Sequence, residues 1–211
     1  MTDFNTALDL YLNGDHASAL HVWRLLAEQG DVRSQYNLGV LYDGGEGVPV
    51  DKPLAAQYYR AAAQQAYPDA AFNLAVMLVE GDGVPAAPEE AAHWFWVAAE
   101  AGNAQAQFRL GLQYDTGSGL PKDPEQAAQW YYRAAQAGEP NAASNLGRCF
   151  AMGEGVARSD VDAYKWFNIA AELGASNAAR YRERVARELS PEERLRAGEL
   201  SQAWLREFKS S

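Results

Sequence analysis

The chain has little cysteine, few cations and no long apolar run, and each shortage excludes a class of protein. Cys149 is the single cysteine, so no internal disulfide can form, and we expect a reducing, cytoplasmic setting. The 18 lysines and arginines stand against 28 aspartates and glutamates, for a net charge of −10. Because phosphate binding needs clustered cations, nucleic acid is not an expected partner. No apolar stretch approaches the roughly 18 residues of a membrane-spanning helix.

Residue patterns that carry chemistry are also scarce. The three histidines, His16, His21 and His93, have no spacing suited to a shared metal ion with Cys149 or a carboxylate. No Ser-x-x-Lys or Gly-x-Ser-x-Gly sequence occurs, which removes the simplest serine nucleophiles. Residues 1–5 lack the basic and apolar regions of a signal peptide. We therefore predict no catalytic residue, no metal and no cofactor, and expect that the protein is not an enzyme.

What the chain does carry is an internal repeat. Four markers recur every 36 residues: a Leu-Gly pair, a loop glycine, an alanine and an aromatic residue. They stand at Leu38-Gly39, Leu74-Ala75, Leu110-Gly111 and Leu146-Gly147; at Gly47, Gly83, Gly119 and Gly155; at Ala55, Ala91, Ala127 and Ala163; and at Tyr58, Trp94, Trp130 and Trp166. Such a period indicates an array of stacked units, whose function lies in a surface more often than in one catalytic pocket.

Each repeat has the pattern of two helices joined by a loop. In the third copy, apolar residues at four-residue spacing predict a helix over 104–114. The segment that follows is rich in glycine and proline, which stops this helix. Asp123 before Pro124 predicts the N-cap and first position of a second helix, and Gly138 predicts its end. The Gly-x-Gly of the loop follows no strand and lacks a third glycine, so we interpret it as structural.

Glycine inside the first helix of a repeat needs an explanation. It costs about 1 kcal/mol relative to alanine, yet it recurs at Gly39, Gly111 and Gly147. We therefore predict that another helix crosses closely at these positions. The aromatic residue at position 58 and its equivalents should fill the space beside them.

Two end segments flank the repeats. Residues 1–30 predict a helix pair with a short loop, residues 31–174 hold the four repeats, and residues 175–211 predict capping helices within one single domain. Ser190 to Glu193 reads as a capping box that opens the last helix. We expect twelve helices, no strand, and an open end of the stack covered by Trp204, Leu205 and Phe208.

The repeat pattern resembles a known family. It reads Ala-x-x-x-Leu-Gly-x-x-Tyr, then Gly-x-Gly-Val, Asp-x-x-x-Ala, Trp-aromatic and Ala-Ala-x-x-Gly, from about Asp31 to Gly174. This is similar to Sel1-like repeats, relatives of tetratricopeptide repeats with a longer loop. The resemblance implies an all-α fold, a right-handed α/α superhelix of about six stacked helix pairs, and protein binding as an adaptor. The alanine-rich repeats also resemble those of bacterial members.

The resemblance suggests where a partner would bind. In tetratricopeptide-like superhelices the first helix of each pair lines a concave groove, where an asparagine can hold the backbone of an extended peptide. A polar stripe fits this description, because residues four apart share a helix face; it comprises Arg33, Asn37, Asp69, Asn73, Gln105, Arg109, Asn141 and Asn145. Arg109 breaks the asparagine pattern and is the better candidate for partner choice. The alternative is that these asparagines serve only the fold.

Three functions follow from these patterns. The leading hypothesis is a non-enzymatic scaffold that binds a peptide or protein segment in the groove, and the acidic charge would steer it toward basic segments. The same charge also fits a surface that is merely well solvated. One alternative is an enzyme with hydrolase-like activity in a groove pocket. Another is a structural protein that self-assembles through its C-terminal helix, so that a monomer and a weak homodimer both stay open.

Overall fold

The computed structural model describes residues 3–210. Within that range the chain forms twelve α-helices and no β-strand, as predicted from the sequence. Residues 1, 2 and 211, which belong to the predicted end segments 1–30 and 175–211, lie outside the described range. The helices fall into two compact units, unit 1 up to Asn103 and unit 2 from Ala104 onward. No helix within residues 3–210 has the length and apolar character that crossing a lipid bilayer requires.

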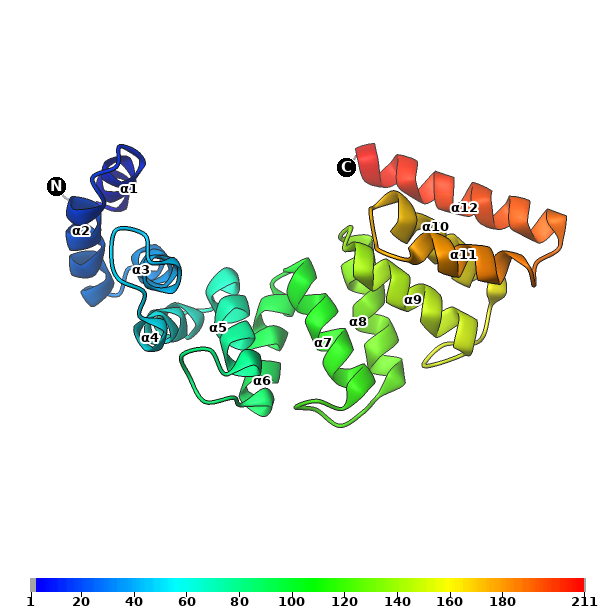
Figure 1. Cartoon of the computed structure of the whole chain (residues 1–211), viewed down its shortest axis with the longest axis horizontal. Coiled ribbons are helices and arrows are strands. Elements are labelled where there is room, and N and C mark those ends of the chain that lie inside the picture. Colours follow the sequence, from blue (N-terminus) through cyan, green and yellow to red (C-terminus); the bar gives the residue numbers. More distant parts are fainter. Residues whose placement is uncertain (1–2, 211) are drawn as a thin grey trace. The chain divides into compact units, whose positions relative to one another are not determined.

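Unit 1 consists of three successive helical hairpins (Figure 1). Within each pair we name the first helix A and the second helix B. The helices are α1 (Phe4–Leu12), α2 (His16–Glu28), α3 (Val32–Gly44), α4 (Lys52–Ala63), α5 (Pro68–Glu80) and α6 (Pro88–Glu100). Helix α2 packs against α3, and α4 packs against α5, so that each hairpin buries a face of the next. The first hairpin has the short loop that its sequence predicts.

Unit 2 continues the pattern with two hairpins and then departs from it. Its helices are α7 (Ala104–Thr116), α8 (Pro124–Gln136), α9 (Pro140–Met152), α10 (Asp160–Glu172), α11 (Ala178–Ala186) and α12 (Pro191–Ser210). Helices α9 and α10 form the last hairpin of the repeat type. Both α11 and α12 pack against α10, and Figure 1 shows the long α12 running beside this pair.

Local capping interactions start the helices where the sequence predicts. The Asp123 carboxylate accepts hydrogen bonds from the backbone N–H groups of Glu125 and Gln126, at 3.0 and 3.1 Å. At the start of α12, the Ser190 N–H donates to Glu193 at 2.9 Å, and the Glu193 N–H donates to the Ser190 hydroxyl at 3.2 Å. This reciprocal pair is a capping box, which satisfies two backbone donors that the helix itself leaves unpaired.

Interior glycines let helix A and helix B of one repeat pack closely. An aromatic ring of helix B lies directly over each of these glycines, in the space that a Cβ atom would need. A Cβ would lie 2.5 Å from the ring in the pair Gly39–Tyr59, 2.7 Å in Gly111–Tyr131 and 2.9 Å in Gly147–Phe167. The close approach is thus confirmed, but position 58 as the filling residue is wrong by one place. The rings over the glycines come from the next residue, because successive helical positions point about 100° apart.

The Gly-x-Gly loops have a packing role as well. The second glycine of the loop lies against the start of the preceding helix B and has a positive φ angle, which glycine adopts without steric cost. The pairs within one unit are Gly47 on His16, Gly83 on Lys52 and Gly155 on the backbone of Pro124. A side chain at any of these glycines would overlap the neighbouring helix.

Helix α12 returns over the B helices. The Trp204 indole N–H donates to Gln136 at the end of α8, and the Trp204 ring lies 6.0 Å from that of Trp166 on α10. The Phe208 ring contacts Gly138, and Leu205 is buried in the same core cluster. The prediction that these residues cover the open end of the stack is therefore wrong. The groove between α8 and α10 is apolar, whereas α11 is rich in charged residues, so the apolar side chains of α12 bury more surface in the groove.

Candidate functional site

In unit 1 the predicted polar stripe lies along α3 and α5. Arg33 is exposed, and its guanidinium carbon lies 4.1 Å from the centre of the Phe4 ring. Asp69 is exposed and accepts a 3.4 Å hydrogen bond from the Asn103 amide. Asn37 is half-buried. Arg33 and Asp69 are therefore the members of the stripe that reach solvent most fully in this unit.

Asn73 is half-buried and differs from the other members because it lies near two tyrosines of the preceding repeat. Burial raises the pKa of Tyr36 and of Tyr59, and the nearby Asn73 acts on both in the opposite direction. Both roles of this asparagine, contact with a partner and support of the fold, stay predictions.

In unit 2 the stripe lies along α7 and α9. Gln105 and Arg109 are exposed on α7. On α9, Asn141 is exposed and its amide donates to Glu139 at 3.2 Å, whereas Asn145 is half-buried. Within α9, Asn145 shares its face with Met152, which lies two turns further along the helix. The stripe on α9 thus continues from polar to apolar surface.

A pocket that the sequence did not predict adjoins this face, between α9 and α11. Its volume is about 490 Å³, and Phe167 and Val185 contribute apolar surface to its lining. Met152 and Tyr181 also line it, and they are 66% and 46% exposed. Charged residues of both signs complete the lining, among them Arg184, Glu154 and Glu188. Exposed Met and Tyr side chains inside a charged rim form a surface suited to an apolar or aromatic anchor residue of a partner.

Arg148 fixes the wall of this pocket. Its guanidinium forms ion pairs with Asp115 on α7 and with Glu154. Burial lowers the pKa of Arg148. The neighbouring negative charges, Asp115 foremost, have a larger effect and raise the pKa above its ordinary value. Asp115 also accepts a 3.1 Å hydrogen bond from Tyr131. Arg148 is therefore held in one place, and its charge is already compensated within the fold.

Reactive groups do not gather at this surface. Burial raises the pKa of the Cys149 thiol to about 11, so that the thiol is protonated near neutral pH. Cys149 is free and buried, where it packs as a small apolar side chain. Among residues 3–210, no group of three histidine, cysteine, aspartate or glutamate side chains is arranged to hold a metal ion.

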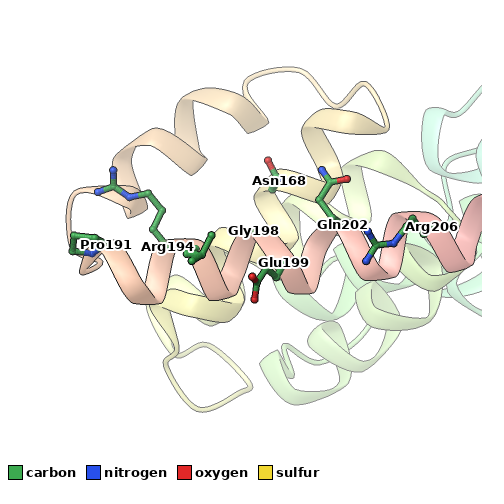
Figure 2. A pocket seen from close by; sticks show the side chains of 8 residues that line it. Asn168, Pro191, Arg194, Gly198, Glu199, Gln202 and Arg206 are labelled. Carbon is green, nitrogen blue, oxygen red and sulfur yellow. The ribbon is translucent and has the colours of Figure 1, made fainter.

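A shallower pocket of about 690 Å³ follows α12 (Figure 2). Asn168 of α10 contributes to its lining, together with Arg194, Gly198 and Gln202 of α12. Figure 2 shows Asn168 and Gln202 pointing to the same side of α12. The Asn168 amide is already occupied, because it donates to Ser201 at 2.8 Å and accepts from Arg182 at 2.7 Å. The first bond anchors α12 to α10, and the second anchors α11 to α10.

Charge divides sharply between the two units. Residues 1–103 contain 14 acidic and 4 basic residues, and residues 104–211 contain 14 of each, so the whole net charge of −10 belongs to unit 1. Two of the basic residues of unit 1 are neutralised locally. Lys52 bridges Asp43 and Asp82, which raises the pKa of Lys52, and Arg60 pairs with Glu90. The surface of unit 1 is therefore strongly acidic.

The repeated helix pairs, with glycine-ring packing inside each pair, define an all-α repeat protein. The family model of the Sel1 repeat matches residues 32–67, 68–103, 104–139 and 140–174, and the chain belongs to the Sel1 repeat family. The matched range agrees with the repeat boundaries predicted from the sequence.

Solved structures of bacterial proteins resemble the chain. A Sel1 repeat protein from Oxalobacter formigenes is 30% identical with a TM-score of 0.80, over 85% of this chain and 74% of that one. The protein c5321, described as a protective antigen of uropathogenic Escherichia coli strains with an SLR fold, is 26% identical with a TM-score of 0.62. That match covers 97% of this chain and 53% of c5321, so this chain spans about half of its length. No protein with a curated description matches the sequence.

Proposed function

We propose that the protein is a non-enzymatic scaffold that holds a peptide or protein segment against the A-helix faces of its repeats. Sel1 repeat proteins are generally protein-interaction scaffolds, and the chain belongs to that family. The proposed contact residues are Arg33, Asn37 and Asp69 in unit 1 and Gln105, Arg109, Asn141 and Asn145 in unit 2. Asn73, which lies near two tyrosines of the preceding repeat, completes the predicted stripe.

The pocket between α9 and α11 supports this proposal most strongly. It lies beside the polar stripe of α9, and it offers the exposed Met152 and Tyr181 where a soluble surface would usually be polar. Polar side chains that pair with a peptide backbone, next to an apolar pocket that takes one anchor residue, are what recognition of an extended segment requires.

The charge of unit 1 supports a basic partner segment. Fourteen acidic residues against four basic ones would attract a cationic segment and raise its association rate at low ionic strength. A cytoplasmic location is part of the proposal, as is the absence of nucleic-acid binding. The right-handed path and the count of six stacked pairs stay predictions.

The proposal is tested by affinity capture from a cytoplasmic extract of the native source, with mass spectrometry of the bound proteins. A variant that combines Asn37→Ala, Arg109→Ala and Asn145→Ala should keep its helical circular-dichroism spectrum and lose most of the captured partner. Tyr181→Ala should weaken the same capture about tenfold, because an aromatic anchor contact would be lost.

The matched control changes exposed polar residues of B helices, Gln129→Ala with Glu172→Ala. This control should retain the partner in full. If the triple variant and Tyr181→Ala both capture as much partner as the unmodified chain, the A-helix faces do not bind the partner and the proposal is wrong.

A further inference from the structure

Unit 2 contains an intramolecular example of how a groove between two B helices is filled. The groove lies between α10 and the end of α8, and the C-terminal part of α12 occupies it. The Trp204 indole N–H donates to Gln136, the last residue of α8, and the ring packs near Trp166. One turn later, Phe208 lies on Gly138, just beyond the end of α8. The occupant is thus an amphipathic helix with a Trp-x-x-x-Phe edge.

Unit 1 contains the equivalent groove three repeats earlier, between α2 and α4. The spacing of 108 residues places Glu28 at the Gln136 position, Gly30 at the Gly138 position and Tyr58 at the Trp166 position. Helix α2 ends at Glu28 as α8 ends at Gln136. The position of the helix end and the presence of a side-chain acceptor there are therefore repeated.

Among residues 3–210, no helix fills this second groove. A pocket of about 280 Å³ lies there, with Ala27, Glu28, Tyr58 and Ala61 in its lining. No heavy atom lies within 4 Å of the position that a Cβ of Gly30 would take, whereas Phe208 fills the same place at Gly138. Ala61 stands where α10 has the buried Ile169, and this smaller side chain leaves room at the base of the pocket.

We propose that the α2–α4 groove binds an amphipathic helix of a partner protein that carries Trp-x-x-x-aromatic spacing. The tryptophan enters the pocket beside Tyr58 and Ala61, and its indole N–H donates to Glu28. The second aromatic residue lies on Gly30. This surface is formed by B helices and is independent of the A-helix faces in the proposed function.

The chemistry of the groove narrows the partner further. Glu28 is a carboxylate where unit 2 has the neutral amide of Gln136, so the acceptor is stronger and favours a cation next to the tryptophan. Arg60 stands at the position of Asn168, which pairs with Ser201 of α12. Since Arg60 is engaged by Glu90, a small polar residue of the partner fits there. We therefore expect the partner helix to carry a small polar residue, a tryptophan three positions after it and a basic residue close to the tryptophan.

A fluorescein-labelled synthetic peptide of residues 190–210 is a suitable probe, because it carries this pattern in Ser201, Trp204, Arg206 and Phe208. Titrated with the full chain and followed by fluorescence anisotropy, it should bind saturably. Glu28→Ala should weaken binding about tenfold, since a charge-assisted hydrogen bond is lost. Glu28→Gln, which copies the acceptor of α8, should retain most of the affinity.

Two further variants locate the peptide. Ala61→Trp fills the pocket and should abolish binding, and a peptide with Trp204→Ala should not bind. Binding that is equal for the unmodified chain, Glu28→Ala and Ala61→Trp would mean that the peptide displaces α12 in unit 2, which overturns the proposal. Absence of binding to the unmodified chain overturns it as well. If the full chain self-associates and the peptide reverses this association, the groove binds a second copy of the chain. That result would overturn the proposal of a separate partner protein.

Discussion

Units 1 and 2 are built on one 36-residue pattern but present different surfaces. Unit 1 carries the entire net charge of −10 and leaves its α2–α4 groove open. Unit 2 has balanced charge, and its own helix α12 fills the equivalent groove between α8 and α10. The repeat therefore gives both units the same backbone pattern, and the docking of α12 in unit 2 leaves different surfaces open in the two units.

Odd and even repeats also differ within each unit. In the odd repeats a tyrosine over the interior glycine donates to an aspartate of helix A: Tyr59 to Asp43 at 3.4 Å and Tyr131 to Asp115 at 3.1 Å. In the even repeats both partners are apolar: Phe95 with Val79, and Phe167 with Ala151. The hydroxyl and its acceptor appear or disappear together, because a buried hydroxyl without a partner is costly.

The largest effect is expected from breaking the packing of α12. Leu205→Ala should destabilise unit 2 by about 2–5 kcal/mol, because it leaves a cavity in a buried cluster. Native-state hydrogen exchange with mass spectrometry should show faster exchange in α8 and α10 and no change in α2 and α4. The control Leu195→Ala, at a side chain 66% exposed, should be nearly neutral. If amide exchange became equally faster in both units, they would unfold together, which would contradict the expected restriction of the effect to unit 2.

Interior glycines should respond in opposite directions according to what lies above them. Gly39→Ala in unit 1 and Gly111→Ala in unit 2 should each cost about 1–3 kcal/mol, because the new Cβ meets an aromatic ring. Gly198→Ala in α12 should instead stabilise by up to about 1 kcal/mol, since its Cβ would enter open space and alanine favours the helix. Urea denaturation measures all three. Stabilisation by Gly39→Ala or Gly111→Ala would contradict the ring packing.

The smallest effect is expected from removing the tyrosine hydroxyl in each of the two tyrosine–aspartate pairs. Tyr131→Phe should lower stability by about 1 kcal/mol, the typical value of one hydrogen bond. Tyr59→Phe should cost less, because its bond to Asp43 is longer. Thermal unfolding of both variants gives the comparison, and a larger loss for Tyr59→Phe would reverse our ranking of the two pairs.

Much of the fold could be predicted because its signals are local and repeated. Asp123, Pro124 and the Ser190–Glu193 capping box act through neighbours in sequence, and four copies of the Leu-Gly pair gave the period. Side-chain direction was harder. The aromatic residue over Gly39 is Tyr59 rather than Tyr58, since both positions are apolar in pattern and only the packed helix pair distinguishes them.

The candidate sites show the same limit. The stripe from Arg33 to Asn145 followed from the family resemblance and the helical spacing, but the closeness of Asn73 to two tyrosines of the previous repeat depends on how the hairpins stack. The pocket between α9 and α11 is lined by Met152 and Tyr181. Because α11 follows the last repeat, the 36-residue period does not relate these two residues.

The sequence by itself determined the helices, their caps, the 36-residue repeat and the acidic balance, because these depend on local backbone preferences, on a period and on composition. Tertiary structure alone decided where α12 docks, which aromatic ring covers each glycine, and that the α2–α4 groove stays open while α12 covers its equivalent in unit 2. The physical reason is that burial of apolar surface is not directional. Several docking positions satisfy the same amphipathic pattern, and only the shapes of the packed neighbours choose among them.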